Sequence, residues 1–363
     1  MFQAGMGVFG TPAFELDAVE LDGETMAVAE SVIDETPFCR LRRFSTGRAE
    51  GRRVLLCAPL AGHRSVVMRD AIAALVAVAD VCVTDWVDAR DVPCEAGRFG
   101  LDEYVLMLQR FMTRLDPGQL DVVAVCQATV PALAAASRLA ADGQEVRTLV
   151  LMGGPIDARQ RPTMLGRMAA SMSDEVFEQA CTGAVPPPYR GAGRTVYPGF
   201  LQLPTLASGQ PDRMVTLVRG AMPSPWWEDR ASRSAVQSAA AGYAAMMDMP
   251  AEFLLDTMHT VFQQFLLPRG QWRVAGELVR PAALRTTRLL TVEGDRDAIS
   301  GAGQTHAAHV LCTGLPASRR KAMTIADCDH YGLFSGEVWR CKVFPVVHAW
   351  LAGPADGCVA ADQ

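Results

Sequence analysis

The feature that most constrains the fold of this chain is an alternation of short apolar runs with segments of helical spacing. The apolar runs, which indicate buried strands, lie at residues 53–58, 80–86, 120–125 and 148–152. The segments of helical spacing between them lie at residues 68–79, 101–115 and 130–141. This order predicts an α/β fold with a mostly parallel sheet flanked by helices, whose functional loops follow the carboxyl ends of the strands.

The pattern changes after residue 155. The next segment, residues 156–285, is rich in Met, Pro and aromatic residues, and no clear strand is visible in it. Two helices are expected there, at 231–247 and 251–266. Strands then resume at 288–292 and 321–325, and a last helix is expected at 339–351. We therefore expect residues 156–285 to be a helical cap inserted into an α/β core that comprises residues 49–155 and 286–353.

The first 48 residues read as a leader that packs on the core. Helical spacing is visible over residues 24–33, and residues 39–44 indicate a strand. The leader carries no basic segment followed by an apolar run, so we expect no secretory signal. The most apolar long stretch, residues 122–141, is too polar and too interrupted for a membrane-spanning helix. A cytoplasmic protein without a transmembrane segment is the expectation.

The amino-acid composition argues against several classes of protein. The 363 residues are 50% hydrophobic and 20% charged, which excludes a disordered chain. The 34 basic and 40 acidic residues give a net charge of −6, whereas a nucleic-acid-binding protein is expected to carry a basic excess. The 10 cysteines show no repeated C-x-x-C spacing. Reduced thiols, no structural zinc and no other metal site are therefore expected.

One of these cysteines stands where a strand passes directly into a helix. The run LDVVAV at residues 120–125 leads into Cys126 and Gln127 and then into an Ala-rich helix. This is the arrangement of the G-x-S-x-G nucleophile elbow, with small residues at the flanking positions because strand and helix approach closely. Ala124 and Ala128 occupy those positions here. Cys126 is therefore the candidate nucleophile, and the backbone N–H of Gln127 is a candidate oxyanion donor.

The partners of such a nucleophile follow later strands. After the strand at 288–292 come Asp295 and Asp297, of which Asp297 is the preferred acid and Asp295 the alternative. His330 follows the strand at 321–325 and is the candidate base. The chain order of nucleophile, acid and histidine is that of α/β-hydrolases. In this hypothesis Cys126 attacks an ester or thioester carbonyl, His330 takes its proton, and Asp297 orients the imidazole.

The loop after the strand at 53–58 supplies the second oxyanion donor in this fold. Leu60 and Ala61 are both candidates for that donor. Gly62 would let a ligand approach closely, and together with His63 it is assigned to substrate binding.

Several motifs together resemble the intracellular polyhydroxyalkanoate (polyhydroxybutyrate) depolymerases. The resemblance runs from about residue 37 to residue 350. It rests on the motifs APLAGH, VTDWVDARDVP, AVCQATVPALAA, LMGGPIDAR, YPGFLQL, TVEGDRDAISGAGQT and HYGLFSG, which occur here in the order of the family. The resemblance implies an α/β-hydrolase fold with a cap and a Cys-Asp-His triad whose positions match Cys126, Asp297 and His330.

The resemblance also implies the substrate, the amorphous poly(3-hydroxybutyrate) (PHB) of storage granules, and cytoplasmic action at the granule surface. Four aromatic residues of the cap are candidate contacts for this apolar polyester: Tyr197, Phe200, Trp226 and Trp227. No cofactor is expected. Two alternatives to hydrolysis stay open: transfer of the acyl group to coenzyme A, giving 3-hydroxybutyryl-CoA, and a non-catalytic granule-associated protein. The sequence makes no prediction of oligomeric state.

Overall fold

The computed structural model of this protein describes residues 13–21, 23–48, 51–61, 64–202 and 246–353. Its centre is an eight-stranded sheet in the order β15-β14-β8-β7-β5-β6-β4-β3. The strands from β15 to β6 run parallel, and β4 and β3 continue the sheet in antiparallel pairing. The strands are β3 (Ala29–Glu35), β4 (Cys39–Ser45), β5 (Arg53–Cys57), β6 (Asp80–Trp86), β7 (Leu120–Val125), β8 (Thr148–Met152), β14 (Arg288–Gly294) and β15 (Arg320–Ile325).

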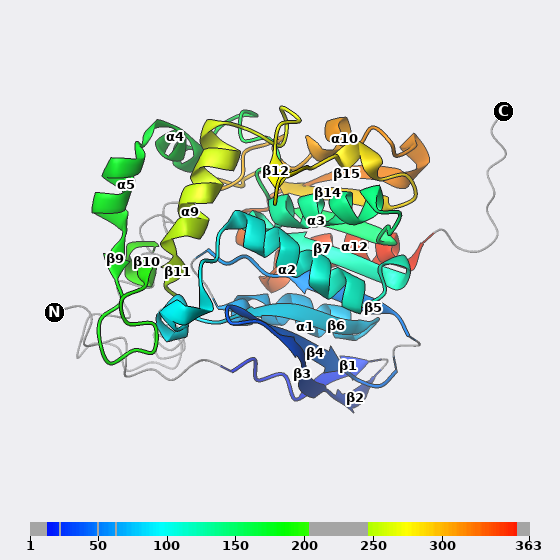
Figure 1. Ribbon diagram of the computed structural model, residues 1–363. Helices are drawn as coiled ribbons and strands as arrows, with labels where there is room; N and C mark the ends of the chain where they lie inside the picture. Colours follow the sequence, from blue (N-terminus) through cyan, green and yellow to red (C-terminus); the bar gives the residue numbers. More distant parts are fainter. Residues whose placement is uncertain (1–12, 22, 49–50, 62–63, 203–245, 354–363) are drawn as a thin grey trace, which may run out of the picture.

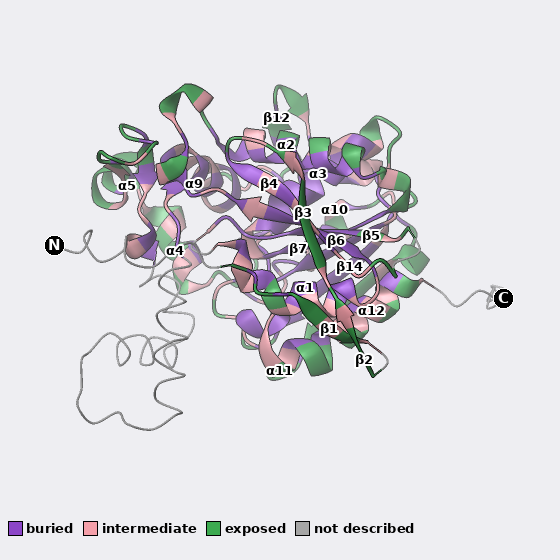
Figure 2. Ribbon diagram, turned by 90° about the horizontal axis from the view of Figure 1, so that it is seen from below, coloured by how far each residue is buried: buried purple, intermediate pink, exposed green. Residues whose placement is uncertain are grey.

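Helices cover both faces of this sheet (Figures 1 and 2). One face carries α2 (Leu101–Arg114) and α3 (Thr129–Ala141), and the other carries α1 (Arg69–Val76) and α12 (Phe344–Ala352). Every residue of β7 and β8 is buried, which is why these strands are continuous apolar runs rather than alternating ones. The predicted α/β fold with a mostly parallel sheet is confirmed. Two short helices, α10 (Ala308–Leu311) and α11 (Gly336–Val338), complete the core.

The leader differs from the sequence expectation in one element. The predicted helix at 24–33 is wrong, because this segment forms β2 (Glu24–Ala27), paired with β1 (Ala18–Leu21), and then β3. Its residues are exposed or half-buried, so the segment has no buried apolar stripe that would hold a helix on the core. The predicted strand at 39–44 is present as β4. Both β3 and β4 extend the main sheet, so this segment supplies two of its strands.

The cap lies beyond the carboxyl ends of β7 and β8 (Figure 1). It contains α4 (Met164–Ser171), α5 (Asp174–Cys181) and α9 (Ala251–Thr257), which continues as the π-helix Met258–Gln263. Contrary to expectation the segment also contains strands, each too short to leave a periodic pattern: β9 (Gly183–Ala184), β10 (Thr195–Tyr197), β11 (Met249–Pro250), β12 (Arg273–Val274) and β13 (Glu277–Leu278). The helix expected at 231–247 falls almost wholly outside the described residues.

A buried carboxylate joins the core to the cap. The side chain of Asp88, which follows β6, is only 1% exposed. It accepts hydrogen bonds from Arg64 Nη2 (3.2 Å), Arg90 Nε (3.1 Å) and the backbone N–H of Asp248 (3.2 Å). Burial raises the pKa of Asp88 to about 6, although the charge of Arg90 lowers it. Asp248 in turn accepts from Arg90 Nη2 (3.0 Å) and from the N–H of Gly199 (2.9 Å), so the network ties the VDARDVP loop to the base of the cap.

None of the helices in the described part of the chain combines the length and the apolarity that spanning a bilayer requires.

Candidate active site

Cys126 occupies a sharp turn between β7 and α3. Its φ of +55° lies in the left-handed region, which is uncommon and strained for a residue other than glycine. A turn of 3-10 helix, Cys126–Ala128, leads from it into α3. The hydroxyl of Thr129 donates to the carbonyl oxygen of Cys126 over 2.8 Å and so holds the turn. The sharp strand-to-helix turn that the sequence predicts is therefore present, at the carboxyl end of a fully buried strand.

Two glycines after β8 leave room for the elbow and for the loop that follows His330. A Cβ on Gly154 would lie 1.7 Å from Thr129 Oγ1 and 2.5 Å from the carbonyl oxygen of Cys126. Gly153 has a φ of +59°, and a Cβ there would lie 2.6 Å from Leu333 Cδ1. The two glycines of the LMGGP motif are therefore explained by the close approach of the segment after β8, Gly154 to the elbow and Gly153 to Leu333.

His330, Asp297 and Cys126 are brought together by three different loops. His330 Nδ1 lies 2.7 Å from Asp297 Oδ2, and the ring also hydrogen-bonds the side chain of Cys126. The other carboxylate oxygen of Asp297 accepts from the N–H groups of Ile299 and Ser300, both at 2.8 Å. The carboxylate is thus fixed from both sides, and it holds the imidazole with Nδ1 toward Asp297 and Nε2 toward Cys126.

Electrostatics at His330 favour the imidazolium form. The residue is only 3% exposed. Burial alone lowers the pKa of His330, but the charges of Cys126 and Asp297, with their hydrogen bonds to the ring, raise it well above its ordinary value. An imidazole held between a cysteine side chain and a carboxylate is an arrangement that can activate a cysteine nucleophile.

The two candidate acids, Asp295 and Asp297, have different partners in the structure. Asp295 lies on the surface, where its Oδ1 accepts from the N–H of Cys328 over 3.1 Å. Such backbone donors lower the pKa of Asp295. Its partner is therefore the loop before His330, whereas Asp297 contacts the imidazole itself.

A buried glutamate that the sequence analysis did not assign shapes the loop that carries Asp297. Glu293, near the end of β14, accepts from the N–H groups of Gly303 (2.7 Å), Thr305 (2.8 Å) and His306 (2.9 Å). The hydroxyl of Thr305 in turn donates to the carbonyl oxygen of Gly154 over 2.9 Å. These bonds give a structural role to the residues of the TVEGDRDAISGAGQT motif that follow Asp297.

Ala61 and Gln127 lie side by side next to the elbow. The backbone N–H of Ala61 donates to Gln127 Oε1 over 2.9 Å, and both residues line the same cavity as Cys126. Leu60 is buried (2% exposed) and is not among the described residues that line the cavity. Of the two candidate donors in this loop, the geometry thus favours Ala61. Gly62 and His63 lie outside the described residues.

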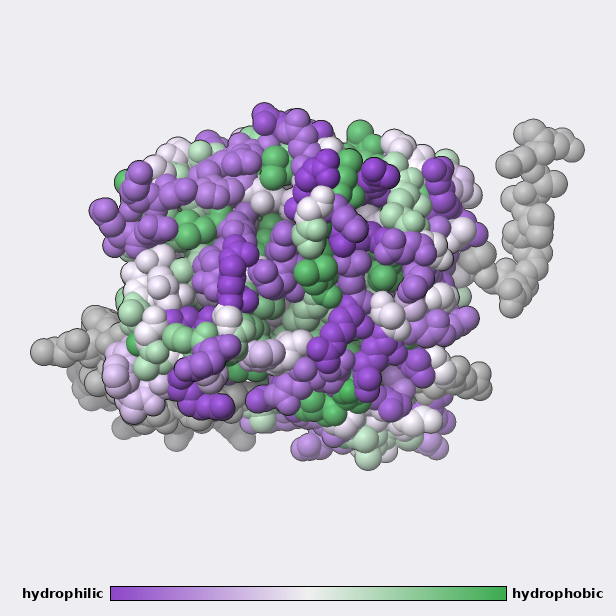
Figure 3. Space-filling model, in the orientation of Figure 1, coloured by the Kyte–Doolittle hydropathy of each residue, from purple (hydrophilic) through white to green (hydrophobic). Residues whose placement is uncertain are grey.

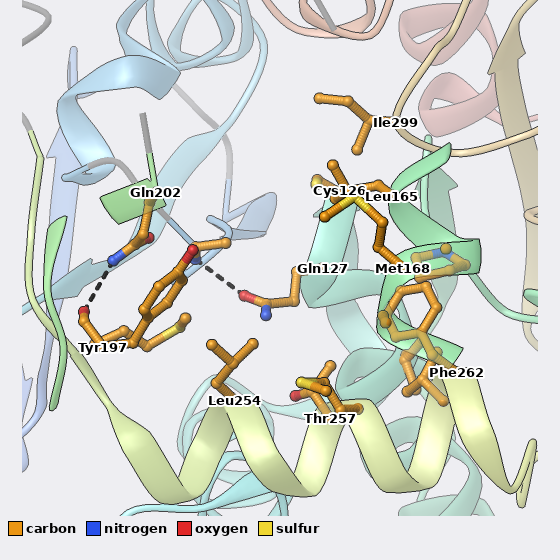
Figure 4. Close-up of a pocket in the computed structure, with 18 of the residues that line it drawn as sticks. Cys126, Gln127, Leu165, Met168, Tyr197, Gln202, Leu254, Thr257, Phe262 and Ile299 are labelled. Carbon is orange, nitrogen blue, oxygen red and sulfur yellow. Dashed lines mark hydrogen bonds between the residues drawn. The ribbon is translucent and has the colours of Figure 1, made fainter. Parts of the chain in front are cut away.

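The cavity has a volume of about 260 Å³ and lies between the elbow and the cap (Figure 4). Its walls are mostly apolar, and α4, α5, α9 and the π-helix that follows supply much of the side that faces the cap. Of the predicted aromatic contacts, Tyr197 lines it, whereas Phe200 is half-buried and is not among the described lining residues. Trp226 and Trp227 lie outside the described residues. Four further lining residues, Met168, Gln202, Leu254 and Phe262, carry no sequence motif, and only the Met-rich composition of the cap indicates this segment.

Three other histidines of the described core and cap have partners away from Cys126. His306 and His309 both hydrogen-bond the hydroxyl of Thr291, at 2.7 and 2.8 Å, and burial lowers the pKa of His309 to about 4. In the cap, His259 Nε2 lies 2.6 Å from Asp174 Oδ1. Within the described ranges, no group of three or more His, Cys, Asp or Glu side chains is arranged to hold a metal ion.

Several known structures resemble this chain at low sequence identity. A membrane phospholipase A, described as a bacterial virulence factor, is 14% identical, with 90% of this chain and 86% of that chain covered and a TM-score of 0.50. Bromoperoxidase from Bacillus anthracis is 13% identical, with 90% and 100% covered and a TM-score of 0.49. A meta-cleavage product hydrolase from Pseudomonas fluorescens IP01 is 14% identical, with 92% and 97% covered and a TM-score of 0.48. No curated protein matches the sequence.

The parallel sheet, the cap and the elbow define an α/β-hydrolase. Residues 153–354, more than half of the chain, match the family described as PHB de-polymerase C-terminus. The chain belongs to the PHB depolymerase family and is a carboxylic ester hydrolase.

Proposed function

We propose that this protein is an intracellular PHB depolymerase that cleaves ester bonds of amorphous storage polyester through Cys126, His330 and Asp297. The observation that supports this most directly is the hydrogen-bonded series of these three side chains beside an apolar cavity. A polyester with apolar side groups suits such a cavity, and membership in the PHB depolymerase family points to the same polymer.

In the proposed reaction the thiolate of Cys126 attacks an ester carbonyl of the polymer, and the C–O bond to the leaving alcohol breaks. His330 Nε2 delivers the proton to the departing oxygen, which leaves a thioester on Cys126. A water molecule then attacks the thioester, with His330 as the base, and releases the acid and the free thiol. Asp297 keeps the ring in the required tautomer throughout.

The negative charge that develops on the carbonyl oxygen needs hydrogen-bond donors. The N–H of Gln127 follows the nucleophile directly, and the N–H of Ala61 reaches the same side of the elbow. For Ala61 to donate to the substrate, the side chain of Gln127 has to give up its present hydrogen bond. The substrate carbonyl then takes the place of the Gln127 amide oxygen.

Action at a granule surface is supported by exposed apolar side chains on the cap. Met164 and Met168 of α4 and Val176 of α5 are 55%, 52% and 55% exposed. Met168 also lines the cavity, so this surface borders the opening of the site. Figure 3 shows hydrophobic side chains reaching the surface of the cap between α5 and α9.

The test is release of 3-hydroxybutyrate from native amorphous PHB granules by the purified protein. Wild type should release product, Cys126→Ala should not, and Cys341→Ala, at an exposed cysteine outside the site, should match wild type. Absence of release by wild type, or undiminished release by Cys126→Ala, would contradict the proposal. A parallel reaction with coenzyme A identifies the acceptor, because transfer to the thiol gives 3-hydroxybutyryl-CoA instead of the free acid. Sedimentation with granules without release would favour the non-catalytic alternative.

A further inference from the structure

Ala58, the first residue after β5, has its peptide groups fixed by three buried side chains. Its carbonyl oxygen accepts hydrogen bonds from Trp86 Nε1 (3.0 Å) and from the hydroxyl of Tyr104 (3.1 Å). Its N–H donates to Thr84 Oγ1 over 2.9 Å. Ala58 and these three residues are at most 2% exposed, so water does not compete for the bonds.

Ser65 is tied to the same strand as Ala58. Its hydroxyl donates to the carbonyl oxygen of Thr84 over 2.6 Å and accepts from the N–H of Trp86 over 3.3 Å. Thr84 and Trp86 both belong to the end of β6, so Ala58 and Ser65 are held at one place on the sheet. Ala61, the proposed second oxyanion donor, lies between these two attachment points in the chain. The bonds give a role to the VTDW part of the VTDWVDARDVP motif, which the triad leaves unexplained.

The link from Ala58 to Ala61 is short and constrained, because only Pro59 and Leu60 separate them. The ring of Pro59 fixes its φ, and Leu60 is buried. Such a link has little freedom to absorb a shift of the Ala58 carbonyl. A shift would therefore reach the N–H of Ala61, whose distance from the developing oxyanion decides how well it stabilises the charge.

The ring of Tyr104, on α2, is itself held by its neighbours. It packs edge-on against Trp86, with ring centroids 4.7 Å apart at an interplanar angle of 85°. It also contacts Phe253 of the cap helix α9, at a centroid distance of 5.6 Å. These contacts fix the direction of the hydroxyl. Burial raises the pKa of Tyr104 well above its ordinary value, so the hydroxyl stays protonated and remains a donor.

We propose that Tyr104 and Trp86 are positioning residues of the reaction, which hold the N–H of Ala61 at the oxyanion through the carbonyl of Ala58. Neither is among the described residues that line the cavity, so they act through the loop and not by touching the substrate. The inference rests on the proposed function, because the oxyanion forms only when Cys126 attacks a carbonyl.

Tyr104→Phe removes the hydroxyl and leaves the ring packing and the Trp86 bond in place. We expect kcat/KM for p-nitrophenyl butanoate to fall about tenfold, less than the roughly 10²- to 10³-fold cost of losing a whole oxyanion donor. Ser137→Ala is the matched control, because it too removes a buried hydroxyl that donates to a backbone carbonyl, that of Leu133 at 2.6 Å. This control should keep the wild-type kcat/KM.

A ketone that Cys126 attacks reversibly reports on the donor without turnover. The thiolate adds to the carbonyl carbon of propyl trifluoromethyl ketone, and the electron pair of the C=O π bond moves to the oxygen, which then lies where the oxyanion forms. Tyr104→Phe should raise the Ki of this ketone about tenfold, in parallel with the loss of kcat/KM. The Ki of the corresponding alcohol, which has no carbonyl, should not change. An unchanged Ki for the ketone would overturn the inference.

Alkylation of Cys126 by iodoacetamide separates positioning from general damage to the site. In this reaction the thiolate displaces iodide from carbon, and no oxyanion forms. Tyr104→Phe should therefore be alkylated at the wild-type rate and with the wild-type pH profile. Equal losses of alkylation and hydrolysis would show damage to the pair of Cys126 and His330 and would contradict a positioning role.

Trp86→Phe removes the other donor to the same oxygen and should raise the Ki of the ketone to a similar extent. Tyr104→Phe, which keeps the ring, decides the question if Trp86→Phe does not fold. Cys126-dependent hydrolysis of the butanoate ester and of PHB that is unchanged in Tyr104→Phe would leave the proposed function standing and overturn this inference. A ketone Ki that depends on Tyr104, in an enzyme that releases nothing from PHB, would support the inference while the proposed substrate fails.

Discussion

The side-chain carbonyl of Gln127 accepts a hydrogen bond from the backbone N–H of Ala61 over 2.9 Å. The amide oxygen of Gln127 therefore already occupies the position from which the proposed oxyanion would accept the hydrogen bond of Ala61. A substrate carbonyl has to compete with this oxygen for the N–H of Ala61. The rate of the reaction should therefore depend on how strongly the side chain at position 127 accepts that hydrogen bond.

Gln127→Glu is expected to lower kcat/KM about 100-fold. A carboxylate holds the N–H of Ala61 more strongly than an amide does, and its charge repels the developing oxyanion. Gln127→Ala keeps the backbone N–H and removes the competitor, so its kcat/KM should stay within about tenfold of wild type. Steady-state kinetics on a p-nitrophenyl ester measures both. A Gln127→Glu enzyme as active as wild type would show that Ala61 donates no bond to the oxyanion.

Asp297→Asn is expected to lower kcat about 10³- to 10⁴-fold with little change in folding. The amide can present an N–H to Nδ1 of His330, which stabilises the wrong tautomer of the ring. Asp295→Asn is the matched control, since Asp295 contacts the backbone of Cys328 and not the imidazole. Rates within tenfold for Asp297→Asn, or an equal loss for both variants, would remove Asp297 from the triad.

The pKa of His330 is expected to fall in Cys126→Ala. The charge of Cys126 is a principal cause of the raised pKa, and burial, which lowers it, remains in the variant. NMR titration of the imidazole resonances in wild type and variant measures the change. An equal or higher pKa in Cys126→Ala would contradict the thiolate–imidazolium pair.

The same raised pKa predicts how stability depends on pH. Because the folded protein holds the His330 proton more tightly than the unfolded chain, this group stabilises the fold fully below its ordinary pKa of about 6.5. The contribution is lost as pH rises through the raised pKa. The difference in unfolding free energy between wild type and His330→Gln should therefore shrink as pH increases above about 6.5, as denaturant unfolding can measure. A difference that grows with pH would reverse the assigned sign.

Asp88→Ala is expected to lower the free energy of unfolding by about 3–5 kcal/mol. Removing one partner of a buried ion network leaves the guanidinium groups of Arg64 and Arg90 without their carboxylate. Arg40→Ala, which breaks an exposed ion pair with Glu35, should change the free energy of unfolding by less than about 1 kcal/mol. Urea unfolding of both variants checks this. Similar small effects would show that the core-to-cap network adds little stability.

Much of the core was predictable from local sequence. Strands such as β7 and β8 are buried on both faces, so they are short continuous apolar runs that stand out between helices of regular spacing. The elbow was predictable as well, because a strand that runs through Cys126 directly into a helix admits few other arrangements. Asp297 and His330 follow strands that end at the same edge of the sheet, so the topology brings them to the elbow.

The remainder depends on contacts between distant segments. The strand β3 forms at the sheet edge because β4 pairs with it, although its own residues have helical spacing. The bond between Ala61 and Gln127 joins residues 66 positions apart, and no local pattern indicates it. The cavity likewise arises where α4 meets the π-helix, so its lining residues, such as Met168 and Phe262, share no motif.

The central claim is that Cys126 carries the acyl group during ester cleavage. Its most direct test is rapid-quench mass spectrometry of the enzyme mixed with a 3-hydroxybutyrate oligomer, followed by peptide mapping. The account predicts a thioester of one or more 3-hydroxybutyryl units on the peptide that contains Cys126, formed at the rate of the first product burst. Product release with no adduct, or with the adduct on another residue, would contradict it.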